Sequence, residues 1–277
     1  MQYFRRILIC YSSEKDKNAV ISKTIANSAK KLHNPIIPSE IDIISVEDTV
    51  IVDKMYDLAI SVGGDGTLLR LAHLMAPFNT PIIGVNLGRR GFMPEIELYA
   101  LEEAFDKLLN SDFTCEHYSY LVGKTANDED IAVNDIFVCK TDMLKTVELG
   151  LYVDDQFVAS YICDGILISS ALGSTAYNRA LNGMVVHPDC PVFIVTPVGT
   201  VDSDFKSLVV SDESIVKIKI LNLKESDYAT VGFDGTQTVF GLKEGQEISI
   251  MKSDSTFKMI HLKGFEYYSN LRKKLAK

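Results

Sequence analysis

The stretch Ser61-Val62-Gly63-Gly64-Asp65-Gly66-Thr67-Leu68-Leu69 decides how the first part of this chain folds. The apolar segment before it, 55–60, is typical of a strand, and the segment after it, 68–75, is typical of a helix. Three glycines at the junction let backbone N–H groups approach a ligand where a Cβ atom would block it. We therefore predict a strand, a glycine turn and a helix in succession.

This turn has the composition of a phosphate site. The N-terminus of the following helix offers unpaired N–H donors and a partial positive charge, which together favour a bound phosphate. Asp65 places one carboxylate among these donors, where it is suited to take a proton from an attacking hydroxyl in phosphoryl transfer. The alternative is a plain glycine turn in which Asp65 or Thr67 caps the helix, because short glycine motifs also recur by accident.

Composition limits the classes of protein to consider. The chain has 277 residues, of which 47% are hydrophobic and 23% charged, as expected for one large or two ordinary soluble domains. Its net charge of −9 argues against a nucleic-acid partner bound through a broad basic surface. No apolar run reaches about 18 residues, so we expect no membrane span. The five scattered cysteines form no CxxC pair, which indicates neither a disulfide framework nor a zinc site and predicts a cytoplasmic protein.

The first third of the chain alternates between strand and helix patterns. Short apolar runs bounded by turns and interleaved with helices indicate a parallel sheet covered on both faces. We therefore predict a Rossmann-like α/β domain over residues 1–112. Its expected strands include 6–11, 41–45 and 81–86, and its expected helices are 18–32 and 98–109.

The pattern changes near residue 113, after which short β-type runs dominate to about residue 259. Runs at this spacing, separated by Asp-Gly and Asn-Gly turns, predict an all-β, sandwich-like domain over residues 113–261. A short helix is expected at 174–181, and the amphipathic tail 265–275 is expected to return as a helix to the first domain. The predicted strands are 131–139, 146–153, 156–159, 165–169, 192–195, 215–220, 230–233, 238–240 and 247–251.

A second polar constellation lies in Asp164–Asn178, where a predicted strand runs into a glycine loop. Ser174 and Thr175 could simply cap the helix that follows, and Tyr177 alone would more often be a packing aromatic. Taken together, one acid, two hydroxyls, open backbone and an aromatic plane are what recognition of adenine and ribose requires. We interpret the loop as a nucleotide-binding element.

Three further candidates are ambiguous when each is considered alone. Asn134-Asp135 is a turn or bulge pair, or a pair of ligand contacts. Asp234-Gly235 is typical of a hairpin turn. Asn86–Phe92 follows a strand, and its arginines could meet phosphates or be solvated in a loop.

In their order along the chain these motifs resemble the NAD kinase family. The resemblance covers roughly residues 60–240, and its GGDGT motif alone is weak because lipid kinases carry it too, whereas GSTAYN is much more specific. The segments that carry the resemblance are GGDGT at 63–67, NLGxxGF at 86–92, ND at 134–135, DG at 164–165, GSTAYN at 173–178, Gly183, His187-Pro188 and DG at 234–235.

The resemblance implies transfer of the γ-phosphate of ATP, or of a polyphosphate, to the adenosine 2′-hydroxyl of NAD. It also implies an N-terminal α/β domain, a β-rich NAD-binding domain and a homo-oligomer, either tetramer or dimer. Asp65 would be the general base, and Gly64, Gly66 and Thr67 would form the phosphate seat. The remaining binding residues would be Asn134 and Asp135 at the ribose, Asp164, Ser174, Thr175, Ala176, Tyr177 and Asn178 around adenine and nicotinamide, and Asp234 as a further polar contact.

The sequence departs from the family pattern at two places. Ser170-Ala171-Leu172 stands where a Thr-Pro-Thr or Thr-Pro-Ser is usual, so Leu172 lacks a hydroxyl that could meet the adenine amino group. The segment 196–202 also differs from the usual loop with its proline and histidine. Both differences bear on affinity and donor choice rather than on reaction type.

The cofactor expected is Mg²⁺, brought with the donor nucleotide, because no dedicated magnesium cage is apparent. No GxxxxGK[ST] motif occurs, which excludes a P-loop mechanism. Two other functions remain open at this point: a lipid kinase with the GGDGT motif, and a non-catalytic sensor that binds NAD(P).

Overall fold

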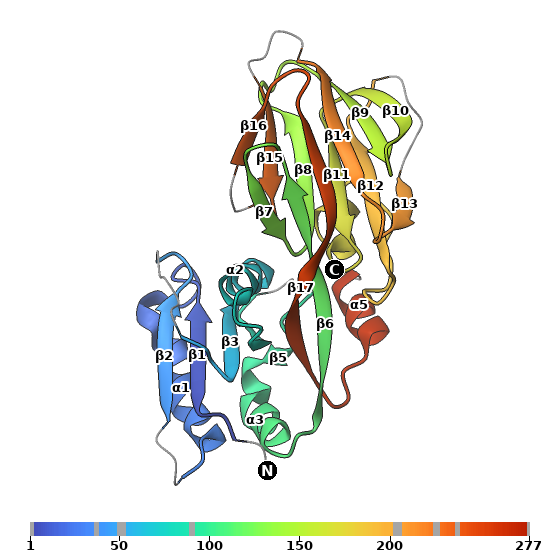
Figure 1. The fold of residues 1–277 in the computed structure, drawn as a ribbon. Helices are drawn as coiled ribbons and strands as arrows, with labels where there is room; N and C mark the ends of the chain where they lie inside the picture. The colour runs from blue at the N-terminus through green and yellow to red at the C-terminus, as the bar shows by residue number, and fades with distance from the viewer. Residues whose placement is uncertain are drawn as a thin grey trace. The chain divides into compact units, whose positions relative to one another are not determined.

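The computed structural model describes residues 3–35, 39–48, 54–88, 92–201, 207–223, 228–235 and 239–275 (Figure 1). It divides into two compact units: a first unit of Met1–Tyr118 with Thr256–Lys277, and a second unit of Ser119–Ser255. Two long strands, β6 (Phe113–Lys124) and β17 (Glu247–Leu262), carry the chain from one unit into the other.

The first unit is built on a parallel sheet. Every residue of its strand β3 is buried, as expected when helices cover both faces of a sheet. The last part of β17 joins the sheet in parallel, with Lys258 opposite Pro81. The other strands lie in the order β2 (Glu40–Ser45), β1 (Arg6–Tyr11), β3 (Leu58–Gly63), β4 (Pro81–Asn86) and the short β5 (Ile96–Glu97).

Helices pack on both faces of this sheet. The apolar residues of α1 (Val20–Ala29) and α3 (Leu101–Leu109) share one core with alternate residues of the strands. Helix α2 (Asp65–Met75) packs on the opposite face, where a Cβ atom on Gly84 would lie 3.0 Å from Leu68 Cδ1. The predicted helices at 18–32 and 98–109 are each entered through a 3₁₀ turn, η1 (Lys17–Ala19) and η3 (Leu98–Ala100), and the first ends in another, η2 (Lys30–Leu32).

The second unit consists of two antiparallel sheets. One contains β10 (Gln156–Cys163), β9 (Val147–Val153), β14 (Val216–Asn222) and the first part of β17. The other has the order β13 (Leu208–Ser211), β12 (Val192–Val198), β11 (Gly165–Ser170), β8 (Asp135–Lys140), β15 (Ala229–Phe233) and β16 (Val239–Leu242). Strand β7 (Glu129–Ala132) pairs with β6.

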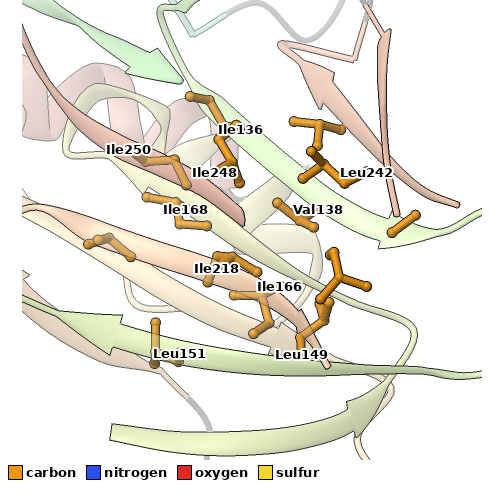
Figure 2. Close-up of a cluster of buried hydrophobic side chains, with 14 of the residues drawn as sticks. Ile136, Val138, Leu149, Leu151, Ile166, Ile168, Ile218, Leu242, Ile248 and Ile250 are labelled. Carbon is orange, nitrogen blue, oxygen red and sulfur yellow. The ribbon is translucent and has the colours of Figure 1, made fainter. Parts of the chain in front are cut away.

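Apolar side chains from the two sheets form a single core. Figure 2 shows Leu149 and Ile218 of one sheet gathered with Ile166 of the other. Each side chain of this size stabilises the fold by about 1.5–3 kcal/mol when it is fully buried. Together, the two units confirm the predicted fold class of an α/β part followed by a β-rich, sandwich-like part, with the C-terminal helix α5 (Tyr267–Leu275) in the first unit.

The structure corrects several element predictions. The strand predicted at 131–139 is wrong: β7 ends at Ala132 and β8 begins at Asp135, because the backbone between them turns. The helix predicted at 174–181 is shorter and begins with a 3₁₀ turn, so that η4 (Leu172–Thr175) precedes α4 (Tyr177–Ala180). Strands β6 and β13 were not predicted, and Thr238 of the predicted strand 238–240 lies outside the described residues.

Among the described residues, no helix combines the length and the apolar character that crossing a membrane requires.

Candidate active site

The glycine turn after β3 requires its glycines for close approach. A Cβ atom on Gly63 would lie 2.2 Å from Thr67 Oγ1, so the buried Thr67 side chain packs directly beneath the turn. Gly64 precedes α2 in an extended conformation with φ −126°. Around Gly66, which is exposed, no atom lies within 4 Å of the place a Cβ would take. The open side of the predicted phosphate seat is therefore at Gly66, while Thr67 supports the turn from below.

The Asp65 carboxylate bonds to the loop that follows β4. The cap position of α2 is Gly64, which has no side chain that could bond the first N–H groups of the helix. The half-buried carboxylate accepts hydrogen bonds from the backbone N–H of Phe92, at 2.9 Å to each oxygen, and of Met93, at 3.0 Å to Oδ1. These bonds fix the direction in which the carboxylate points.

The end of β4 lies next to the glycine turn. The N–H of Leu87 donates to the carbonyl of Gly63 at 2.8 Å. Asn86 holds the following residues in place, because its Oδ1 accepts from the N–H of Gly88 at 2.9 Å and its Nδ2 donates to Glu97 Oε1 at 3.1 Å. The arginines predicted to meet phosphates, Arg89 and Arg90, lie outside the described residues, as does Gly91. Carboxyl ends of neighbouring parallel strands are where α/β folds bind ligands.

Sequence analysis missed one residue at this edge, Lys15. It follows β1, the neighbour of β3, and its Nζ lies 2.6 Å from the place a Cβ on Gly64 would take and 3.5 Å from the corresponding place on Gly88. A single lysine in the polar segment after a strand carries no local signal of function. Its approach to two glycines that are separated by 24 positions in the sequence is visible only in three dimensions.

In the second unit the carboxylate of Asp234 organises a separate cluster. Asp234 is 8% exposed, and its two oxygens accept the backbone N–H groups of Val133 at 2.8 Å, Asn134 at 2.7 Å and Asp135 at 3.1 Å. Its own N–H donates to the carbonyl of Asp135 at 2.9 Å. These bonds turn the backbone between β7 and β8, which explains why the predicted strand 131–139 is interrupted.

Asp135 is the buried acid of this cluster, with 6% exposure. Burial, and secondly the negative charge of Asp234, raise the pKa of Asp135 to about 7. Near neutral pH its carboxyl group therefore takes up or releases a proton, and it can either donate to or accept from a ligand hydroxyl.

The loop after β11 packs onto the same turn. A Cβ atom on Gly173 would lie 2.1 Å from the carbonyl oxygen of Asn134. Ser170 joins the two segments, since its Oγ donates to the carbonyl of Val133 at 2.7 Å and accepts from the N–H of Gly173 at 3.0 Å. Three motifs that are far apart in sequence thus meet within the second unit.

The side chains of the GSTAYN loop differ in whether their polar atoms are already hydrogen-bonded within the protein. Ser174 is buried, and its Oγ both donates to the carbonyl of Val186 and accepts from the N–H of Val186, each at 3.2 Å. Asn178 is also buried, with Nδ2 donating to the carbonyl of Met184 at 2.9 Å and Oδ1 accepting from Thr196 Oγ1 at 2.7 Å. Both side chains are engaged within the protein.

By contrast, Thr175 and Ala176 are only partly buried, and Tyr177 is 46% exposed. The Tyr177 ring meets Phe137 edge-on at 5.8 Å between centroids. Its exposed surface is what a stacked ligand ring would need.

Asp164 lies at the start of β11, and the GSTAYN loop follows the other end of that strand. The Tyr177 ring nevertheless reaches back toward Asp164, because it meets Phe137, whose ring lies 2.7 Å from the place a Cβ on Gly165 would take. Asp164 Oδ1 pairs with Lys140 Nζ at 2.6 Å, and Gly199, at φ +62°, packs against the carboxylate.

A metal cage built from protein side chains is not found within the described parts of the chain. No group of three or more histidine, cysteine, aspartate or glutamate side chains is arranged to hold an ion there. All five cysteines are free thiols.

Comparison with known proteins agrees with this arrangement. Residues 12–113 match the family model of the ATP-NAD kinase N-terminal domain, and residues 133–262 match that of the ATP-NAD kinase C-terminal domain. An NAD kinase from Methylibium petroleiphilum is 35% identical over 237 residues, which cover 82% of this chain and 77% of the relative. The chain belongs to the NAD kinase family. It is accordingly a phosphotransferase.

Other relatives of the family match nearly the whole chain. An NAD kinase from a Thermoanaerobacter species (strain X514) is 30% identical, covering 98% of this chain and 99% of the relative. The crystal structure of an NAD kinase from Archaeoglobus fulgidus in complex with ATP has a TM-score of 0.75 at 26% identity and covers 98% of both chains. A yeast NADH kinase complexed with NADH has a TM-score of 0.79 at 19% identity, a likeness of fold. These matches do not favour the lipid kinase or the sensor.

Proposed function

We propose that the protein transfers the γ-phosphoryl group of ATP to the 2′-hydroxyl of the adenosine ribose of NAD, forming NADP and ADP. The observation that carries this proposal is the Asp65 carboxylate, held by two backbone N–H groups beside an open glycine turn in a chain of the NAD kinase family. Such a carboxylate is oriented to accept a proton from a hydroxyl at the open turn.

In this reaction Asp65 accepts the proton of the 2′-hydroxyl while the ribose oxygen forms its bond to the γ-phosphorus. The bond from that phosphorus to the bridging oxygen breaks, and ADP leaves with the electron pair. Positioning and neutralisation of charge provide most of the rate enhancement in phosphoryl transfer. Backbone N–H groups at Gly64 and Gly66, together with the N-terminus of α2, are suited to hold the donor phosphates.

We assign binding of the dinucleotide to the domain predicted at 113–261 and the phosphate seat to residues 1–112, joined by 262–277. Asn134 and Asp135 would hold ribose hydroxyls, while Thr175, Ala176 and Tyr177 would line the base. Ser174 and Asn178 would hold the loop rather than contact the ligand, since their polar atoms are already bonded. Asp234 would act through the turn that it folds, and Asp164 would contact the ligand from the start of β11, on the side to which the Tyr177 ring reaches.

Magnesium would be brought by the donor nucleotide, where it neutralises phosphate charge. The glycine turn fits this, because the start of α2 provides N–H groups for the phosphate oxygens that would carry the ion. We also propose a cytoplasmic location, supported by the five free thiols. A homotetramer or homodimer is supported by exposed apolar side chains such as Leu144 at 92% and Phe157 at 59%, and sedimentation would test it.

The proposed reaction is tested by incubating the protein with NAD and Mg-ATP and measuring NADP with an NADP-specific dehydrogenase. Parallel reactions replace NAD by NADH or diacylglycerol, and ATP by polyphosphate. We expect NADP to form from NAD, and no phosphorylated lipid. Binding of NAD without any NADP in the presence of Mg-ATP would instead identify a sensor.

A further inference from the structure

We propose that Lys15 binds the donor phosphates at the glycine turn, a role that rests on the proposed kinase function. The ammonium group lies over the two glycine segments that end β3 and β4: its Nζ would be 2.6 Å from a Cβ on Gly64 and 3.5 Å from one on Gly88. Three neighbouring strands of the parallel sheet, β1, β3 and β4, thus each contribute one element to the same edge.

The segment that carries Lys15 is held in a defined conformation. The N–H groups of Lys15 and Asp16 both donate to the carbonyl of Ser12, at 3.1 and 2.9 Å. Asp16 is buried and fastens the segment to α1, since its carboxylate accepts from Ile21 N–H at 2.9 Å and Ser22 N–H at 2.7 Å. The backbone at Lys15 is therefore held in place, and its side chain extends from a fixed Cα position.

A second carboxylate fastens the other side of the segment. Glu47 accepts from Ser12 Oγ at 3.1 Å and from the N–H of Ser13 at 3.0 Å. Burial works against ionisation of Glu47, yet the hydrogen bonds from Ser13, Ser45 and Ser12 lower its pKa to about 2. The anchor is thus charged throughout the physiological range, and the bonds that hold the segment persist across it.

The charges around Lys15 favour an anionic ligand. Within the described residues no carboxylate pairs with its ammonium group, whereas Lys31 and Lys54 each have carboxylate partners within 3.2 Å. The acid of the turn, Asp65, accepts from the N–H groups of Phe92 and Met93. Lys15 therefore stands beside the positive end of α2, which is unfavourable unless an anion bridges the two.

Phosphate oxygens meet this requirement. A lysine ammonium acts as a point charge toward phosphate, and charged hydrogen bonds of this kind are roughly twice as strong as neutral ones. NAD also carries a diphosphate, but in the proposed reaction it is the γ-phosphate of the donor that must lie next to Asp65, and Lys15 lies at that same glycine turn. We therefore assign Lys15 to the donor triphosphate rather than to NAD.

The test compares Lys15→Met and Lys15→Gln, which remove the charge, with Lys15→Arg, which keeps it. Lys17→Met is the matched control, because Lys17 is also exposed and lies two residues further along. Calorimetry measures the Kd of inorganic triphosphate and of ATP, and steady-state assays give KM for ATP and for NAD. Thermal melting confirms that each variant is folded.

We expect both charge-removing variants to weaken triphosphate and ATP binding about tenfold or more, with KM for ATP rising in parallel. The Kd and KM for NAD should stay within about twofold, the Arg variant should retain most of the affinity, and Lys17→Met should match the wild type. The difference should shrink as salt is raised, because the ammonium is exposed.

The outcomes separate this proposal from the proposed reaction. Triphosphate binding that depends on Lys15 without NADP formation would retain the phosphate site and reject the kinase reaction. NADP formation with unchanged triphosphate Kd and ATP KM in Lys15→Met would reject the role of Lys15 alone. Failure of the wild type to bind either triphosphate or ATP would reject it as well.

Discussion

Two aspartates, Asp65 in the first unit and Asp234 in the second, use their carboxylates on backbone N–H groups in different ways. Asp65 is half-buried beside open glycine backbone, and it accepts from two residues of a loop that follows another strand. Asp234 is buried and accepts from three consecutive residues, whose backbone it folds into a turn. The same kind of bond orients the side chain in one case and shapes the backbone in the other.

This difference shows that a carboxylate bonded to N–H groups is not thereby a catalytic residue. The two aspartates differ in the open space around the hydrogen-bonded carboxylate. At Gly66 a ligand can approach the backbone, whereas the Asp234 side chain is only 8% exposed. We therefore expect substitutions in the first unit to change turnover, and substitutions in the second to change stability and binding.

The largest effect is expected from Asp65→Asn, which should lower kcat by about 10²- to 10⁴-fold while NAD binding changes only a few-fold. The amide keeps the size of the side chain but cannot take the proton. The control is Asp57→Asn, because Asp57 Oδ2 also accepts two backbone N–H groups, of Arg5 at 2.7 Å and Arg6 at 2.8 Å, within the same unit. Asp57→Asn should retain turnover, and equal kcat for Asp65→Asn and wild type would remove Asp65 from the chemistry.

A second test uses the raised pKa of Asp135. This carboxyl is protonated more readily in the folded protein, with a pKa of about 7 against 3.8 in the unfolded chain. Its contribution to stability is therefore complete below pH 4 and is lost as pH rises through 7. The loss reaches up to about 4 kcal/mol, since each pKa unit corresponds to about 1.4 kcal/mol.

Asp135→Asn should abolish this loss of stability. In urea unfolding, the unfolding free energy of the variant should therefore rise relative to that of wild type between pH 5 and pH 8. Asp128→Asn, a change at an exposed carboxylate in a turn of the same unit, should show no such gain. Parallel pH profiles for Asp135→Asn and wild type would mean that Asp135 stays ionised and that Asp234 does not act on it.

Gly173→Ala tests the contact between the loop and the turn. The new Cβ would lie 2.1 Å from the carbonyl oxygen of Asn134, so loop and turn must separate. We expect a loss of about 2–3 kcal/mol in unfolding free energy and weaker NAD binding. Gly232→Ala is the control, because no atom lies within 4 Å of its Cβ position. Denaturant titration of both variants then separates the effect of the steric clash from the effect of replacing a glycine as such.

The smallest effect is expected from Tyr177→Ala. Stacking contributes about equally to the ground state and the transition state, so KM for NAD should rise about five- to tenfold with little change in kcat. Phe137→Leu, which removes only the ring that meets Tyr177 edge-on, should have a weaker effect. If KM for NAD stays at the wild-type value in Tyr177→Ala, the Tyr177 ring packs within the protein and does not contact the ligand.

The sequence was sufficient where structure depends on local pattern. Strands β1 and β4 have the predicted bounds, and the glycine turn lies where the motif placed it, because continuous apolar runs ended by glycine or polar residues mark buried parallel strands. The family followed from the order of motifs. None of these inferences required knowledge of distant contacts.

The sequence was insufficient where one segment acts on another that is far away. The break between β7 and β8 depends on Asp234, which lies 99 to 101 residues further along the chain. Apolar pattern alone made residues 131–139 look continuous. Likewise, Lys15 and the bonds of Asp65 to Phe92 and Met93 arise from strand neighbours and leave no trace in local spacing.

The passage of the chain through β17 has a consequence for how the protein is made. The second unit is one continuous segment, 119–255, whereas the sheet of the first unit is complete only when Lys258 and Met259 pair with Pro81 and Ile82 of β4. During synthesis the N-terminal portion therefore waits, without its last strand, for about 140 residues to leave the ribosome. On stalled ribosomes, residues 119–255 should become resistant to protease before residues 1–118 do. The middle of the chain therefore folds first during synthesis.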